Sequence, residues 1–259
     1  KTAYSIVNRE SDGTRTVAGS PSSGRLVVVD MVRGLAIAGV VLFHLVWDLE
    51  FTGFVSGIAR HPAWLTFGHL LAGTFMVLVG ASLALAHRNG VRWRPFLRRF
   101  AILVVSAMAI TAVTLAVFPG AFIYFGILHA IAAATLIGVA FLRAPAVASL
   151  AAGIIVVGLP FFMQSMTFDT RWLAWIGFSA NPPPSNDYVP VFPWVGLTLI
   201  GIAATKWALA HDLDRMFRIY PAVGPATIAL TWLGRHSLSI FLLHQPILLA
   251  VIVPLSEAQ

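Results

Sequence analysis

The chain has 259 residues, of which 58% are hydrophobic and only 10% are charged, and its mean hydropathy is +0.85. A soluble domain carries about 25% charged residues, so this composition excludes an ordinary globular protein in water. The absence of cysteine excludes disulfides, thiolate zinc sites and a cysteine nucleophile. The net charge of +7 is explained by the basic loops of a membrane protein rather than by nucleic-acid binding, since no basic domain with interleaved aromatic residues is present.

The beginning of the chain differs from the rest. Residues 1–24 are polar and rich in Ser, Gly, Thr and Arg, so we expect them to form a disordered cytoplasmic tail. No small-residue cleavage pattern follows the first apolar run, and we therefore do not interpret the start as a signal peptide. Residues 25–259 are expected to form one all-α, polytopic membrane domain.

Seven apolar segments predict membrane-spanning helices. A span needs about 20 predominantly apolar residues to cross about 30 Å of hydrocarbon. The fifth segment is the weakest, because two glycines and a proline interrupt it. The predicted spans are Val27–Trp47, Trp64–Ala86, Phe100–Phe118, Phe122–Leu142, Ala146–Met163, Val191–Ala210 and Ala226–Val253.

Positive charge is concentrated on alternate loops, which predicts the orientation. By the positive-inside rule, the N-terminus is expected in the cytoplasm and the C-terminus outside. The other loops carry Asp48, Glu50, Arg60, Asp169, Arg171 and Asp187. The loops expected in the cytoplasm carry Arg9, Arg15, Arg25, Arg88, Arg92, Arg94, Arg98, Arg99, Arg143, Lys206, Arg215 and Arg218.

Two ionisable residues lie within the first predicted span. Such groups are costly inside a membrane and are therefore candidates for function. Arg33 and His44 are eleven residues apart. In a helix this spacing is about 16 Å and three turns, so both side chains are expected on one face. The alternative is that Arg33 extends to the lipid headgroups and that His44 only lies at the interface.

Further histidines are predicted in the outer half of the membrane. His129 lies in the fourth segment, His61 precedes the second, and His244 lies in the seventh on the same face as Ser237. With His44 they place four imidazoles at one level, and histidine can take and return a proton near neutral pH. Four imidazoles could also bind zinc, but no spacing such as HExxH supports a metal site, and we expect none. The structural alternative is that polar side chains of this kind only join neighbouring helices.

Several runs resemble one known family. They are Arg25–Ala36 (RLVVVDMVRGLA), Arg60–Trp64 (RHPAW), Phe125–His129 (FGILH) and the spacing from Ser237 to His244. Together they resemble the heparan-alpha-glucosaminide N-acetyltransferase family, including its bacterial relatives of unknown substrate. The interval from Arg33 to His44 also resembles the basic residue, ten residues, His signature of acyltransferase family 3 proteins. The two groups look like branches of one transmembrane acyltransferase superfamily.

The resemblance implies acetyl-CoA bound at the cytoplasmic face, an acceptor at the outer face and a histidine that assists acyl transfer. The eukaryotic pattern Lys-His-Ala-Ser-Trp points to His61, whereas the family 3 pattern points to His44; we expect His44 first and His61 second. His129 falls where the eukaryotic proteins have Gln, which implies a hydrogen bond or a second base. The chain lacks a large luminal loop, a departure from the family that weakens heparan itself as the substrate.

These observations lead to one mechanistic hypothesis. His44 or His61 takes a proton from a hydroxyl or amine of the acceptor, a sugar of an envelope glycan or glycolipid, while Asp48 orients the imidazole. Asp187, Ser237 and His244 are expected to support the site. The phosphates of acetyl-CoA are expected to bind a basic cluster, although such a cluster also suits anionic lipid headgroups. The cluster consists of Arg33, Arg88, Arg92, Arg94, Arg98 and Arg99.

Two other functions fit the same pattern. Buried His and Arg side chains also suit a proton-coupled transporter of small molecules. The chain could otherwise be a structural membrane subunit. In every case we expect a multi-pass protein of the bacterial cytoplasmic membrane, in contact with lipids and without a nucleic-acid partner. A homo-oligomer is left open.

Overall fold

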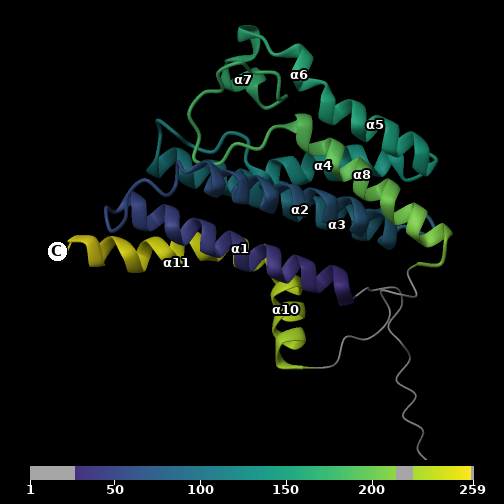
Figure 1. The fold of residues 1–259 in the computed structure, drawn as a ribbon, viewed down its shortest axis with the longest axis horizontal. Helices are drawn as coiled ribbons and strands as arrows, with labels where there is room; N and C mark the ends of the chain where they lie inside the picture. The colour runs from purple at the N-terminus through teal and green to yellow at the C-terminus, as the bar shows by residue number, and fades with distance from the viewer. Residues whose placement is uncertain (1–26, 214–223, 258–259) are drawn as a thin grey trace, which may run out of the picture.

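The structure, a computed structural model, describes residues 27–213 and 224–257, so the predicted tail at 1–24 lies outside the described residues. Most of the described chain is helical, and it contains no strand beyond two isolated bridges. The long helices run side by side, whereas α10 stands across α1 (Figure 1). The helices are α1 (Val27–Phe51), α2 (Pro62–Ala86), α3 (Trp93–Val117), α4 (Ile127–Phe141), α5 (Ala146–Gly158), α6 (Pro160–Met163), η1 (Met166–Phe168), α7 (Arg171–Ala174), α8 (Val191–Ala210), α10 (Pro225–Arg235) and α11 (Ser237–Glu257).

Six helical stretches in the described ranges are long and apolar enough to cross a membrane: α1, α2, α3, α5 with α6, α8 and α11. The predicted all-α, polytopic fold is therefore confirmed. The fourth predicted span corresponds to α4, which has only 15 residues because residues 122–126 are not helical. At 1.5 Å per residue α4 covers only about 22 Å. It runs inside the bundle from the side where α3 ends to the side where α5 begins (Figure 1).

Two predicted boundaries are wrong. The third helix begins at Trp93 rather than Phe100, so three of the five arginines expected in a loop before it, Arg94, Arg98 and Arg99, stand on its first turns. Long basic side chains allow this, because their charged ends can reach water while the stem covers apolar surface. The seventh predicted span is two helices, α10 and α11, with a break at His236.

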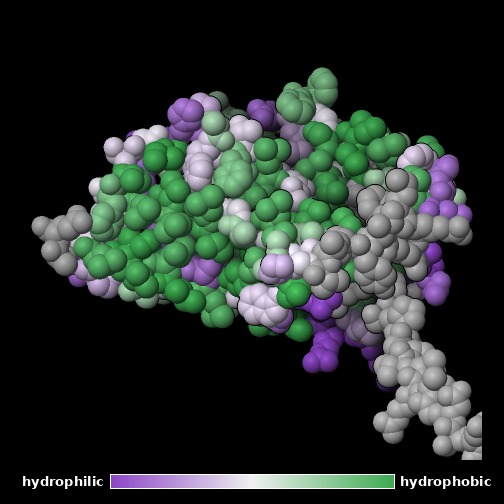
Figure 2. Space-filling model, turned by 60° about the horizontal axis from the view of Figure 1, so that its bottom comes forward, coloured by the Kyte–Doolittle hydropathy of each residue, from purple (hydrophilic) through white to green (hydrophobic). Residues whose placement is uncertain are grey.

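The bundle has two ends that differ in charge. We call the end that carries the α2–α3 turn and the first turns of α3 the basic end, because Arg88, Arg92, Arg94, Arg98 and Arg99 lie there. We call the opposite end, formed by segments 52–61, 118–126 and 164–190, the loop end. Between the ends, the face that includes α11 is mainly apolar, and a few polar residues interrupt it (Figure 2). This surface suits contact with lipid chains.

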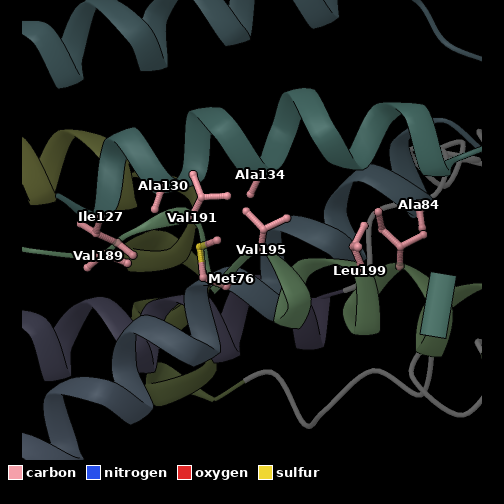
Figure 3. Close-up of a cluster of buried hydrophobic side chains, with 10 residues drawn as sticks. Met76, Ala84, Ile127, Ala130, Ala134, Val189, Val191, Val195 and Leu199 are labelled. Carbon is pink, nitrogen blue, oxygen red and sulfur yellow. The ribbon is translucent and has the colours of Figure 1, made fainter. Parts of the chain in front are cut away.

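The core lies where α2, α4 and α8 meet (Figure 3). Met76 of α2, Ala130 and Ala134 of α4, and Val195 and Leu199 of α8 are almost completely buried there. Small residues allow the helix backbones to approach closely, as is usual between membrane helices. These three tightly packed helices support one side of the functional site.

A second close approach joins α1 to α10. A Cβ on Gly34 would lie against the backbone carbonyl of Leu230, and a Cβ on Gly234 would lie against that of Asp30. The Arg235 side chain contacts the Asp30 carboxylate at 3.5 Å, which ties α10 to the start of α1. The break between α10 and α11 therefore allows α10 to cross α1 while α11 runs beside it.

Candidate active site

One cavity of about 660 Å³ extends between α1, α2, α3, α4 and α11. At the basic end it is lined by Arg33, Arg92 and Arg99, and at the loop end by His44 and Asp187. The Arg33 and His44 side chains thus lie on the same face of α1, as their spacing predicts. A single space consequently connects a basic mouth with an imidazole and a carboxylate near the other end of the bundle.

Arg33 is held in place within the basic part of the cavity. Its guanidinium donates to Oδ1 of Asp30 at 2.9 Å and to Oγ of Ser82 on α2 at 2.7 Å. Asp30 is buried, and its second oxygen faces Arg235. Fixed guanidinium donors beside Arg92 and Arg99 form a site that suits phosphate oxygens.

His44 is paired with His244 across the interface between α1 and α11. Nε2 of His244 lies 3.1 Å from Nδ1 of His44, and Nδ1 of His244 lies 2.7 Å from the carbonyl oxygen of Phe241. In a neutral ring only one nitrogen carries hydrogen, so Nδ1 of His244 must donate to Phe241, and its Nε2 must accept. The hydrogen between the rings then belongs to Nδ1 of His44, which also lies 3.0 Å from the Val40 carbonyl.

This arrangement decides which nitrogen of His44 can act as a base. With hydrogen on Nδ1, the lone pair is on Nε2, and the ring lines the cavity. His69 of α2 lines the same part of the cavity, about two turns from the loop end, and its ring contacts that of Trp194 at a centroid distance of 5.9 Å. A reacting group placed between α1 and α2 at this level would therefore meet imidazole from both helices.

Residues 186–189 close the cavity at the loop end. The Asp187 carboxylate accepts from the backbone N–H of Ile127 at 2.8 Å and so caps the beginning of α4, where the helix dipole favours a negative charge. Burial raises the pKa of Asp187 to about 6, against the opposing effect of this hydrogen bond. Tyr188 donates to the carbonyl of Ala174 at 2.7 Å and holds the segment on α7. Asp187 is the one acidic residue on the cavity lining in the described part of the chain.

Residues 25–246 match the family described as heparan-alpha-glucosaminide N-acetyltransferase, catalytic. The chain belongs to this family. No curated protein and no solved structure matches it. The resemblance drawn from the sequence is confirmed, and with the six apolar helices it makes the chain a membrane acetyltransferase.

The structure does not bring His129 of the acetyltransferase to the cavity. Nδ1 of His129 accepts from the N–H of Gly126 at 3.3 Å, and Nε2 lies 3.2 Å from Oγ1 of Thr111. Because Thr111 donates to the carbonyl of Ile123, it accepts from His129. Both ring nitrogens are thus occupied in joining α3 to the start of α4. His129 lies in the first turn of α4, because this helix begins at Ile127 rather than at Phe122 as the sequence predicts.

His61 also lies apart from His44. It precedes α2, where its Nδ1 accepts from the N–H of Ala63 at 3.3 Å and caps the helix. His61 lines a second, mainly apolar cavity with Trp64 and Phe67. The ring of Phe43, which lines the first cavity, stacks on Trp64 with a centroid distance of 5.6 Å. Of the four imidazoles that the sequence places at one level, His44 and His244 contact each other, whereas His61 and His129 bond to other partners.

Asp48 has a different partner from the one expected. It is completely buried, and its Oδ1 accepts from Nε2 of Gln245 at 2.6 Å. Nδ1 of His44, which we expected Asp48 to orient, is instead bonded to His244 and Val40. The side chain that contacts Nδ1 of His44 is therefore His244 and not Asp48.

The six arginines expected at one phosphate site divide into two groups. Arg33, Arg92 and Arg99 line the cavity. Arg88, Arg94 and Arg98 are exposed and lie off its lining. Ser237, the first residue of α11, lines the cavity as well.

Four polar residues at or next to the site were not predicted from the sequence. Only His69 could have been found, because it is an ionisable residue within a predicted span. The missed residues are His69, Ser82, Asn186 and Gln245.

Proposed function

We propose that this acetyltransferase moves the acetyl group of acetyl-CoA to an amine or hydroxyl of an extracytoplasmic sugar or glycolipid. The single observation that carries the proposal is the cavity that joins the arginine mouth to His44. Arg33, Arg92 and Arg99 bind the phosphates of the donor at the basic end. The pantetheine arm then extends along the cavity and brings the thioester to His44.

His44 acts as the general base. Its Nε2 takes a proton from the acceptor as the acceptor nitrogen or oxygen attacks the thioester carbon. The carbon–sulfur bond then breaks, and the imidazolium returns the proton to the sulfur, so that the products are the acetylated acceptor and CoA with a free thiol. His244 keeps hydrogen on Nδ1 of His44 and thereby keeps Nε2 available.

We further propose that the basic end faces the cytoplasm. The described part of this end carries Arg88, Arg92, Arg94, Arg98 and Arg99, whereas Arg60 and Arg171 lie at the loop end. Such an asymmetry is typical of cytoplasmic loops. Acetyl-CoA would then enter from the cytoplasm, and the acceptor would bind beside Asp187 on the other side.

The proposal is tested with the purified protein in detergent, with acetyl-CoA carrying a labelled acetyl group and glucosamine as the probe acceptor. Wild type should release thiol and label the amine, and acetyl-CoA should raise Tm more than other nucleotides do. His44→Ala should lower transfer by about 10²- to 10⁴-fold, as loss of a general base does. His211→Ala, which removes an exposed histidine off the cavity lining, is the matched control. Full transfer by His44→Ala would reject the proposal. It would also be rejected if the protein, reconstituted in liposomes, accumulated a labelled solute without releasing thiol.

A further inference from the structure

Two buried oxygen atoms at the α1–α11 interface have no hydrogen-bond partner. They are Oδ2 of Asp48 and Oε1 of Gln245, and they belong to the two groups that the 2.6 Å contact already joins. Buried polar atoms are nearly always hydrogen-bonded, so two unpaired acceptors on neighbouring groups need an explanation. Both atoms are acceptors, and a single proton on the Asp48 carboxyl group would supply the donor that is missing from this pair of side chains.

We propose that Asp48 is a neutral carboxylic acid that donates from Oδ2 to Oε1 of Gln245, which closes a ring of two hydrogen bonds. A protonated carboxyl group has one O–H donor and an acceptor oxygen, and the amide offers the complementary pair. If the amide is rotated so that oxygen and nitrogen exchange places, the same ring forms with the proton on the other carboxyl oxygen. Either orientation requires one proton on Asp48.

The surroundings of Asp48 agree with the neutral form. Its side chain is 0% exposed, and an isolated carboxylate inside a membrane is costly. No arginine or lysine forms an ion pair with it in the described ranges 27–213 and 224–257. The titratable groups nearest in sequence on the two helices that meet here are Glu50 and His44 on α1 and His244 on α11. The Glu50 carboxylate accepts from the backbone N–H groups of Ile58 and Ala59. Both imidazoles hydrogen-bond to each other and to backbone carbonyls rather than to the Asp48 carboxyl group.

The neutral pair gives Asp48 and Gln245 a positioning role for the proposed transfer. α11 reaches α1 through two adjacent polar contacts, the His44–His244 pair and the Asp48–Gln245 pair. Because Gln245 follows His244 in α11, a ring that fixes Gln245 on α1 also fixes the distance between the two imidazoles. Asp48 thus acts on His44 through the geometry of α11, without charge.

Replacing Asp48 by its neutral amide tests the role of charge. Asp48→Asn can form both bonds of the ring, so it should keep kcat within about fivefold of wild type and should leave the pH profile unchanged. Asp48→Leu leaves the Gln245 amide unpaired and should lower kcat about tenfold or more. If Asp48 acts as an anion, Asp48→Asn should instead be as impaired as Asp48→Leu, which would overturn the inference.

An infrared measurement decides the protonation state independently of transfer. The difference spectrum between wild type and Asp48→Asn should contain the C=O stretch of a protonated carboxyl group at neutral pH, and Gln245→Leu should shift this band. Absence of the band, or a band that Gln245→Leu leaves in place, would overturn the inference even if Asp48→Asn does not fold. The kinetic arm rests on the proposed function, whereas the spectrum does not. Failure of the proposed function, seen as full activity of His44→Ala, is therefore distinguishable from failure of this pair.

Discussion

Nε2 of His244 lies 3.1 Å from Nδ1 of His44, although the two residues are 200 positions apart in the chain. This contact depends on α11 running beside α1, and it determines the tautomer of the imidazole that lines the cavity. The site is therefore assembled from the two ends of the described chain, and damage to either helix should affect the same nitrogen of His44.

Two substitutions of His244 should show whether its side chain acts by accepting the hydrogen on Nδ1 of His44 or only by filling space. His244→Leu removes the acceptor and should lower kcat about five- to tenfold, the value of one hydrogen bond of about 1 kcal/mol. His244→Gln offers a side-chain oxygen to Nδ1 and should recover most of the loss. The measurement is kcat and KM for acetyl-CoA over a range of pH. Equal impairment of the Leu and Gln variants, or a change confined to KM, would contradict the assigned tautomer.

Arg92, which immediately precedes α3, and the arginines of the first turns of α3 provide a matched test of the donor site. Arg92→Gln and Arg99→Gln should each raise KM for acetyl-CoA about tenfold, because charge-assisted hydrogen bonds contribute about 1.5–3 kcal/mol and water partly replaces them. Arg94→Gln and Arg98→Gln remove the same charge from the same helix but off the cavity lining, so they should leave KM unchanged. If all four variants raise KM alike, the arginines act through the positive potential of the whole surface and not through a specific phosphate site.

The sequence determines the membrane class and the face of α1 on which Arg33 and His44 lie, because both follow from local composition and helical periodicity. The position of α11 against α1 does not follow from any local sequence pattern. The Asp48–Gln245 pair could not be predicted, because it depends on that position. The break at His236 was missed because Gly234, which permits the crossing with α1, is also tolerated inside a membrane helix. His129 was overrated for a related reason: the residues before Ile127 are apolar, but they pair with the loop at Tyr188 instead of continuing the helix.

Asp187 should make stability depend on pH in a defined window. Its folded pKa of about 6 exceeds the ordinary value of 3.8, so the folded state binds this proton more tightly than the unfolded state. Its contribution to stability therefore decreases as pH rises from about 4 to about 6 and is constant above that range. Asp187→Asn still accepts from Ile127 but does not ionise. Its Tm should equal that of wild type near pH 4 and exceed it above pH 6, by an amount that corresponds to about 1–3 kcal/mol. A Tm difference that is the same at every pH would contradict this assignment.

Side chains at Gly34 and Gly234, where α1 and α10 cross, should destabilise the protein. Gly34→Ala and Gly234→Ala would each place a methyl group against a backbone carbonyl, and overpacking of this kind costs about 1–3 kcal/mol. Both variants should lower Tm in detergent and should also raise KM for acetyl-CoA, because Arg33 is adjacent to Gly34. Gly158→Ala is the control, since no atom lies within 4 Å of a Cβ built there. Unchanged Tm in the two crossing variants would show that α10 does not pack on α1 in this way.

Two histidines expected in the site from the sequence, His44 and His129, should differ in their effect on kcat when they are replaced. His129→Leu removes the bond from Gly126 and leaves Thr111 without its second partner, so we expect a loss of about 1–3 kcal/mol in stability. Its kcat, measured well below Tm, should remain within a few-fold of wild type, because neither ring nitrogen reaches the cavity. His44→Ala loses the bond to His244 and should also lower Tm, but it should in addition show the large loss of kcat expected for a general base. Because His44 and His129 occupy the same half of the bundle, a general disturbance of that half would lower both quantities in both variants. Only separate roles keep kcat nearly normal in His129→Leu while it is largely lost in His44→Ala.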